Sequence, residues 1–152
     1  MTPKERGERA AAYFLDGYNC PQSVVLAFSD LLGMDETLLT KMVSPFGGGI
    51  CRIREVCGAV SGMMFVLGSL EGYTSPEDNE GKAALYYTGQ TLVKKFTERN
   101  GKGSFICADI LNKPRGADIP QPELRTESYY HHRPCAEIVR AAAEVLSEYL
   151  GQ

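Results

Sequence analysis

The chain is organised around one stretch, residues 46–62, which reads Phe46-Gly47-Gly48-Gly49-Ile50-Cys51-Arg52-Ile53-Arg54-Glu55-Val56-Cys57-Gly58-Ala59-Val60-Ser61-Gly62. Its three consecutive glycines let the backbone adopt positive φ and approach whatever lies opposite. A charged turn follows, and then Cys57 stands among small residues. The apolar run 63–67 comes directly after and shows no polar stripe, so we predict a buried helix from about Glu55 to Gly68. A thiol at a helix start behind a glycine loop indicates a place for chemistry.

Apolar residues recur at helical spacing through most of the remaining chain. Pro3, Asn19 with Pro21, Asp35 or Thr37, and Pro134 are typical helix starts. We expect further helices over 3 to about 16, 20–32, 35–43, 77–99, 104–111 and 134–150. No sustained alternating run and no hairpin signal predicts a strand. The sequence therefore predicts an all-α fold of about six or seven helices in a single domain, residues 1–152.

Residues 112–132 are the exception to this regular pattern. The segment contains several prolines and mixed polarity, which predicts a long surface loop. Loops of this length in compact domains are often functional lids or mobile segments.

The composition and charge of the chain argue against several classes of function. The formal charge of −3 and pI near 5.4 argue against nucleic acid, because phosphate binding needs a basic face. No apolar stretch approaches the roughly 18 residues that a membrane span needs, so we expect no membrane insertion. Residues 1–8 have no apolar core and do not read as a signal peptide, which predicts a cytoplasmic, thiol-reducing location. Five cysteines are an odd number, so they cannot all pair within the chain.

Four of the cysteines share a setting, since each is expected within the first turn of a predicted helix. They are Cys20, Cys57, Cys107 and Cys135. Unpaired N–H groups and the helix dipole favour an anion there, and thiolate is the reactive form of cysteine. Buried cysteine is also a common core residue, so simple packing stays an alternative, and it fits Cys51 in the loop best. No Cys-x-x-Cys occurs, so any shared site must be assembled by the fold.

Several segments together resemble the C_GCAxxG_C_C family of redox-active proteins. They are Asn19-Cys20-Pro21-Gln22-Ser23, Phe46-Gly47-Gly48-Gly49 and Cys57-Gly58-Ala59-Val60-Ser61-Gly62, followed by Cys107 and Cys135. The resemblance covers nearly the whole chain. It implies that these four cysteines are the functional set, with Cys51 outside it. It also implies a bacterial or archaeal protein of a kind often encoded near transporter genes, with an unknown redox partner that could be linked to a transporter.

Our first hypothesis is thiol–disulfide redox chemistry. On this hypothesis the protein could be an enzyme of the thiol–disulfide oxidoreductase class. Cys57 is the favoured nucleophile, because its surroundings are small and its helix start follows flexible glycine. An arginine within a few ångströms would favour its thiolate further. Cys20 is the expected resolving partner, with Cys107 and Cys135 as a second pair among three possible connectivities. Residues Gly47, Gly48 and Gly49 would give access to Cys57, or form an anion-binding nest. They lack the Lys-Ser/Thr ending of a nucleotide phosphate loop.

Two alternatives belong to other classes. Four thiolates that converge from four helix ends could bind zinc or an iron–sulfur cluster, with Cys20, Cys57, Cys107 and Cys135 as ligands. The chain could instead be a non-enzymatic helical module that works with a transporter or an oxidoreductase. Distances between the sulfur atoms distinguish these readings: one coordination shell indicates metal, close pairs indicate disulfides, and scattered thiols indicate packing.

Overall fold

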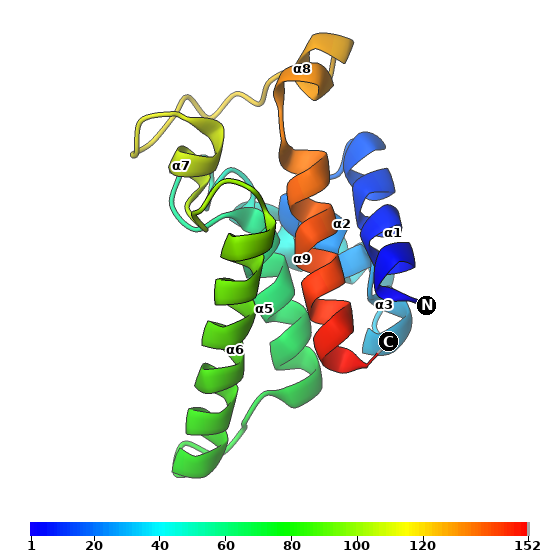
Figure 1. The fold of residues 1–152 in the computed structure, drawn as a ribbon, viewed down its shortest axis with the longest axis vertical. Coiled ribbons are helices and arrows are strands. Elements are labelled where there is room, and N and C mark those ends of the chain that lie inside the picture. Colours follow the sequence, from blue (N-terminus) through cyan, green and yellow to red (C-terminus); the bar gives the residue numbers. More distant parts are fainter. Residues whose placement is uncertain (152) are drawn as a thin grey trace.

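The computed structural model describes residues 1–151, and its regular elements are helices (Figure 1). Within these residues there are nine α-helices, six of them at least seven residues long, one short 3-10 helix and no strand. The elements are α1 (Pro3–Leu15), α2 (Cys20–Leu26), α3 (Ser29–Leu32), α4 (Glu36–Val43), η1 (Ser44–Phe46), α5 (Gly58–Glu71), α6 (Asn79–Arg99), α7 (Cys107–Leu111), α8 (Glu127–His132) and α9 (Cys135–Leu150). The all-α prediction is confirmed.

Helix α9 lies at the centre of the arrangement. It packs against α1, α2, α5 and α6, and Figure 1 shows it between α1 on one side and α5 and α6 on the other, antiparallel to α1. Its predicted apolar stripe is buried, including Ile138, Val139, Ala142 and Leu146. A helix with one wide apolar face is stabilised mainly by burying that face against its neighbours.

The predicted helix over residues 20–32 is two helices, α2 and α3. In a continuous α-helix the carbonyl of Ala27 would accept a hydrogen bond from the N–H of Leu31. Here the buried side chain of Arg6 donates to that carbonyl at 2.8 Å, and Leu31 donates to Phe28 at 2.9 Å instead. A tertiary hydrogen bond from α1 therefore interrupts the helix. Gly33 ends α3 in the left-handed conformation, as predicted.

Helix α5 begins at Gly58, three residues later than predicted, because residues 55–57 are extended. Val56 forms an isolated antiparallel bridge with Ile106. The N–H of Cys57 donates to the carbonyl of Phe105 at 2.9 Å, and the N–H of Cys107 donates to the carbonyl of Glu55 at 2.7 Å. These bonds tie the starts of α5 and α7 together.

Helices α2 and α5 approach closely because α5 carries glycine where they meet. A Cβ added to Gly58 would lie 2.7 Å from Cδ of Pro21, and one added to Gly62 would lie 2.9 Å from the Pro21 carbonyl oxygen. Gly58 would also meet Cβ of Cys20 at 3.2 Å. The glycines of this helix thus admit a close neighbour, and that neighbour carries Cys20.

The segment after α7 arches over one end of the helices before it reaches α8 and α9 (Figure 1). Most of the predicted 112–132 loop is irregular, but its last six residues form α8, capped by the Thr126 side chain. Within residues 1–151, none of the helices combines the length and apolarity needed to cross a membrane.

Candidate functional site: four thiols around one cationic cavity

A cavity of about 370 Å³ lies at the end of the molecule where α2, α5, α7 and α9 begin. Its lining includes all four cysteines that the sequence singles out, namely Cys20, Cys57, Cys107 and Cys135. Residues Gly47, Gly48 and Gly49 also line it. The fold thus brings together residues that lie far apart in the sequence.

Each of the four cysteines stands at a helix start, as predicted. Cys20, Cys107 and Cys135 are the first residues of α2, α7 and α9, and Cys57 is the N-cap of α5. The start of α2 is the most firmly built, because Asn19 and Gln22 form a reciprocal capping box around Cys20. Three of these side chains are buried and Cys20 is half-buried.

Cys20 and Cys135 form the most closely interacting thiol pair. Interaction with the Cys20 thiol, together with the positive charge of Arg133, lowers the pKa of Cys135 to about 7 against the opposing effect of burial. The same interaction raises the pKa of Cys20 well above its ordinary value, and burial raises it further. Cys135 is therefore the thiol of this pair that becomes thiolate near neutral pH.

Aromatic rings hold the two arginines nearest to Cys135. The Arg133 guanidinium lies over the ring of Tyr129 at 5.0 Å and pairs with Glu123. The Arg125 guanidinium lies over the ring of Phe14 at 4.4 Å and donates to the Phe14 carbonyl at 3.2 Å. Stacking on aromatic faces keeps a guanidinium charged while its plane is desolvated. Positive charge is thereby fixed beside the start of α9.

Cys57 and Cys107 have a different electrostatic setting. Burial raises the pKa of Cys57 to about 12, despite backbone hydrogen bonds that act the other way. Burial also raises the pKa of Cys107, but Nη1 of Arg54 donates to its sulfur at 3.6 Å and opposes the shift. Arg54, which lies near Cys57 in the sequence, therefore stabilises the thiolate of Cys107 instead. Cys57, the thiol favoured by the sequence as nucleophile, is held protonated.

The loop between η1 and α5 carries an unusual run of left-handed backbone. Positive φ angles occur at Gly48, Gly49, Ile50, Cys51, Arg52 and Arg54, between 46° and 68°. The sequence predicts this conformation only for glycine, and a non-glycine residue pays about 1 to 2 kcal/mol for it. Strain of this kind persists only where the surroundings impose it, and it clusters at functional sites. In this loop, two of the residues with positive φ, Arg52 and Arg54, line the cavity.

The glycines of this loop make close approaches that a side chain would block. Gly49 has φ +68°, and a Cβ there would lie 2.7 Å from Cβ of Cys107 and 2.7 Å from the N atom of Glu55. A Cβ at Gly47 would lie 2.7 Å from Nδ2 of Asn19. The loop therefore packs closely against Cys107 and against Asn19, the residue before Cys20. Cys51 also borders the cavity, but it is exposed and its thiol donates to the carbonyl of Pro45 at 3.3 Å.

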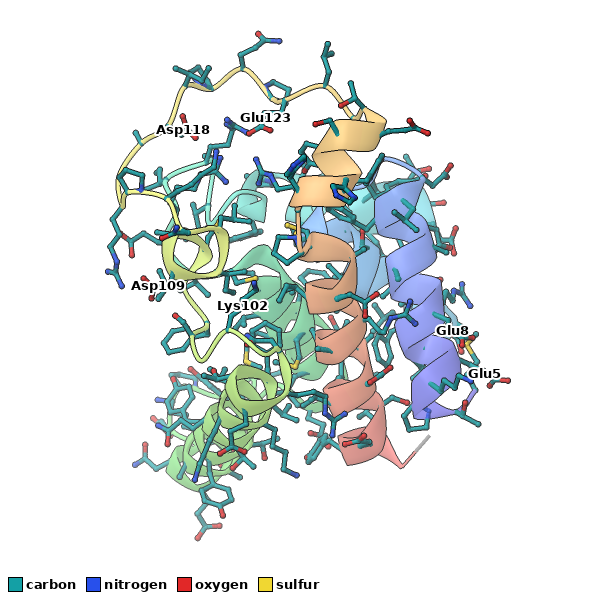
Figure 2. The ribbon with its side chains drawn as sticks, turned by 45° about the horizontal axis from the view of Figure 1, so that its top comes forward. Glu5, Glu8, Lys102, Asp109, Asp118 and Glu123 are labelled. Carbon is teal, nitrogen blue, oxygen red and sulfur yellow. The ribbon has the colours of Figure 1, made fainter. Side chains whose placement is uncertain are left out.

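The loop after α7 is anchored over the cavity by ion pairs. Nη2 of Arg54 lies 2.9 Å from a carboxylate oxygen of Asp118, and Nη2 of Arg52 lies 3.4 Å from the same oxygen. The hydrogen bond from Arg54 lowers the pKa of Asp118 to about 2. Lys113 lies 3.4 Å from Glu123. Figure 2 shows Asp118 and Glu123 on the loop where it arches over this end of the molecule.

These loop contacts are the part of the site that the sequence did not reveal. The residues involved carry no motif spacing, and Asp118 and Arg54 lie more than 60 positions apart. The sequence signal was limited to the length of the segment, which indicated a functional loop.

The donor set does not fit the alternative of a metal centre. Among residues 1–151, no three His, Cys, Asp or Glu side chains are arranged so that they could hold a metal ion. His131 and His132 are exposed on α8, and their rings contact each other edge to face at 5.1 Å between centroids. Zinc and iron–sulfur centres need several ligands in one coordination shell. We therefore derive no chemistry through a metal.

The fold and the site define an all-helical protein whose helix starts bring four thiols and several arginines to one cavity. Comparison with known families agrees with this class. The model of the family described as "Putative redox-active protein (C_GCAxxG_C_C)" matches residues 18–149, and the chain belongs to this family. The redox-active character expressed in that description supports the broader part of our functional hypothesis. No curated protein and no solved structure matches the chain.

Proposed function

We propose that the protein carries out thiol–disulfide exchange, with Cys135 as the nucleophile and Cys20 as the resolving thiol. The observation that carries this proposal is that Cys20 and Cys135, the first residues of α2 and α9, line the same cavity and interact, which lowers the pKa of Cys135 to about 7. Thiolate is the attacking form, and the best attacking thiol has a pKa near the ambient pH. Arg133 and the first turn of α9 stabilise the same negative charge.

A substrate disulfide is reduced in two balanced steps. The Cys135 thiolate attacks one sulfur, the substrate S–S bond breaks, and the departing thiolate takes up a proton as the first product thiol. A mixed disulfide between Cys135 and the other half of the substrate remains. Cys20 then loses its proton and attacks the Cys135 sulfur, which releases the second thiol. Two electrons pass from the cysteine pair to the substrate, and a Cys20–Cys135 disulfide is left.

The coupling between the two thiols orders these steps. While Cys135 is a thiolate, its interaction with Cys20 and its charge keep Cys20 protonated. Once Cys135 is part of a mixed disulfide, that negative charge is gone. Burial still opposes deprotonation of Cys20, but the opposition from Cys135 is removed, so the resolving thiol is easier to deprotonate after the first attack.

This assignment replaces Cys57 as nucleophile in our hypothesis. With a pKa of about 12, Cys57 holds only a very small fraction of thiolate at neutral pH. The backbone bonds between residues 55–57 and 105–107 favour Cys57 and Cys107 as the second pair. The pairing that we propose is therefore Cys20 with Cys135 and Cys57 with Cys107.

Disulfide mapping tests the proposal. The reduced protein is oxidised with substoichiometric small disulfide, acid-quenched, alkylated and digested, and the cysteine peptides are identified by mass spectrometry. We expect the Cys20–Cys135 disulfide to appear first and to disappear on reduction. Cys51→Ser is the control variant, because Cys51 is exposed and lies outside the four. First formation of a Cys20–Cys57 disulfide, or no reversible disulfide among the four, would refute the proposal.

The redox partner, a link to a transporter and a cytoplasmic location stay predictions from the sequence. The proposed exchange rests on the thiols and on the cavity that they line.

A further inference from the structure

The lining of the cavity that holds the thiols carries more positive than negative groups. Its lining includes one carboxylate, that of Glu123, and four guanidinium groups, those of Arg52, Arg54, Arg125 and Arg133. This contrasts with the chain as a whole, whose formal charge is −3. A concave surface of one sign concentrates ligands of the opposite sign. The local charge therefore favours an anionic ligand.

Arg54 supplies a buried donor that has no acceptor among residues 1–151. Its side chain is 2% exposed, its Nη1 donates to the sulfur of Cys107, and its Nη2 donates to Asp118. Its Nε is buried without a hydrogen-bond partner in the described part of the chain. A buried donor without an acceptor is energetically unfavourable. Because Arg54 lines the cavity, its guanidinium offers positive charge to a ligand bound there.

The same arginines are also close to the sulfurs. Arg54 contacts the Cys107 sulfur at 3.6 Å, and Arg133 interacts with the Cys135 sulfur. An anionic group bound by these guanidiniums would thus bring the rest of its molecule to the thiols. Carboxylate suits this role, since its oxygens accept the parallel N–H bonds that a guanidinium presents.

We propose that the substrate is a small disulfide that carries carboxylate groups, held by Arg54 and its neighbours while Cys135 attacks its S–S bond. This inference rests on the proposed thiol–disulfide exchange and adds the substrate class. The volume of about 370 Å³ is near the lower end of the range for small-molecule sites. The two steps of the exchange are unchanged, and the carboxylates take no part in the electron transfer.

Three small disulfides of different charge test the inference on the full chain. The probes are dithiodipropionate, which is anionic, hydroxyethyl disulfide, which is neutral, and cystamine, which is cationic. The loss of the protein thiols is followed by quenched alkylation and mass spectrometry. Each rate is divided by the rate of the same disulfide with a small free thiol, which removes differences in intrinsic reactivity.

We expect the normalised rate for dithiodipropionate to exceed that for cystamine by about tenfold or more at low salt. The neutral probe should fall between them. The difference should shrink as salt is added, because screening weakens the attraction. Equal normalised rates for the three probes would overturn the inference while leaving the proposed exchange intact. Reaction of none of them with the Cys20–Cys135 pair would refute the exchange itself.

Variants of Arg54 and Arg52 test whether these arginines cause the preference for an anionic disulfide. Arg54→Gln should lower the ratio of the anionic to the neutral rate, and Arg54→Lys should retain part of it. A loss of folding would lower both rates and leave the ratio uninformative, so Arg52→Gln serves as a second variant on the less buried neighbour. Arg115→Gln is the matched control, because Arg115 is exposed and does not line the cavity. A ratio that is unchanged in both cavity variants would overturn the assignment of these arginines.

Discussion

Cys20, the first residue of α2, interacts with Cys135, the first residue of α9, in the lining of one cavity. This interaction makes the two thiols unequal, since it lowers the pKa of Cys135 and raises the pKa of Cys20. An attacking thiol and a resolving thiol need this inequality. Experiments can test this inequality of the two thiols. They can also test how the glycine loop and the ion pairs around the cavity contribute to stability.

Replacing either thiol of this pair should stop the reaction at a different step. With Cys135→Ser we expect no mixed disulfide at this site, because the attacking thiolate is gone. With Cys20→Ser we expect the mixed disulfide on Cys135 to accumulate, because nothing resolves it. Intact-protein mass spectrometry after exposure to a small disulfide measures both. Accumulation of the adduct on Cys57 in the Cys20→Ser variant would contradict the roles assigned here.

The alkylation rate of Cys135 should follow its pKa of about 7. Below that pH the thiol is protonated, so we expect a rate at about pH 5 that is roughly 100-fold below its plateau. Arg133→Gln should move the midpoint to higher pH, because it removes positive charge from the thiolate. Iodoacetamide labelling resolved by peptide mass spectrometry gives the profile of each cysteine. A midpoint near the ordinary cysteine value in the unchanged protein would count against the thiolate assignment.

The ion pair between Arg54 and Asp118 should stabilise the protein in a pH-dependent way. The folded-state pKa of Asp118 lies below its ordinary value, at about 2. Its contribution is therefore present above the unfolded pKa of about 4 and is lost as pH falls through about 2. We expect Asp118→Asn to lower the melting temperature at neutral pH, with a difference that narrows on acidification. Glu77→Gln, at an exposed turn, is the control and should change little.

Gly49→Ala should destabilise the protein for two separable reasons. The residue has φ +68°, and the new Cβ would lie 2.7 Å from both Cβ of Cys107 and the N atom of Glu55. Gly103 has the same φ of +68°, but a Cβ added there would meet no atom of the described residues within 4 Å. Gly103→Ala thus measures the backbone cost alone, about 1 to 2 kcal/mol.

We expect Gly49→Ala to lower the free energy of unfolding by clearly more than Gly103→Ala, measured by urea denaturation. It should also change the reactivity of Cys107, which Gly103→Ala should leave unaltered. Equal losses in the two variants would show that the close approach of Gly49 to Cys107 contributes nothing.

Most helices could be predicted because their signals are local. Thr2 and Pro3 begin α1, and the stripe of apolar residues from Ile138 onward makes α9 helical and buried on one side. Two departures have tertiary causes. Arg6 interrupts the helix after Leu26, and the bridge between Val56 and Ile106 delays the start of α5.

The sequence by itself determined the fold class, the helix starts at which Cys20, Cys57, Cys107 and Cys135 stand, and the membership of these thiols in one set. Capping residues, prolines and helical periodicity act within a few positions, so the chain expresses them directly. Only the tertiary structure decided the electrostatic setting of each thiol. Burial, the contact between Cys20 and Cys135, and the position of Arg133 set the thiol pKa values. These are sums over groups brought together by packing, and sequence spacing carries no record of them.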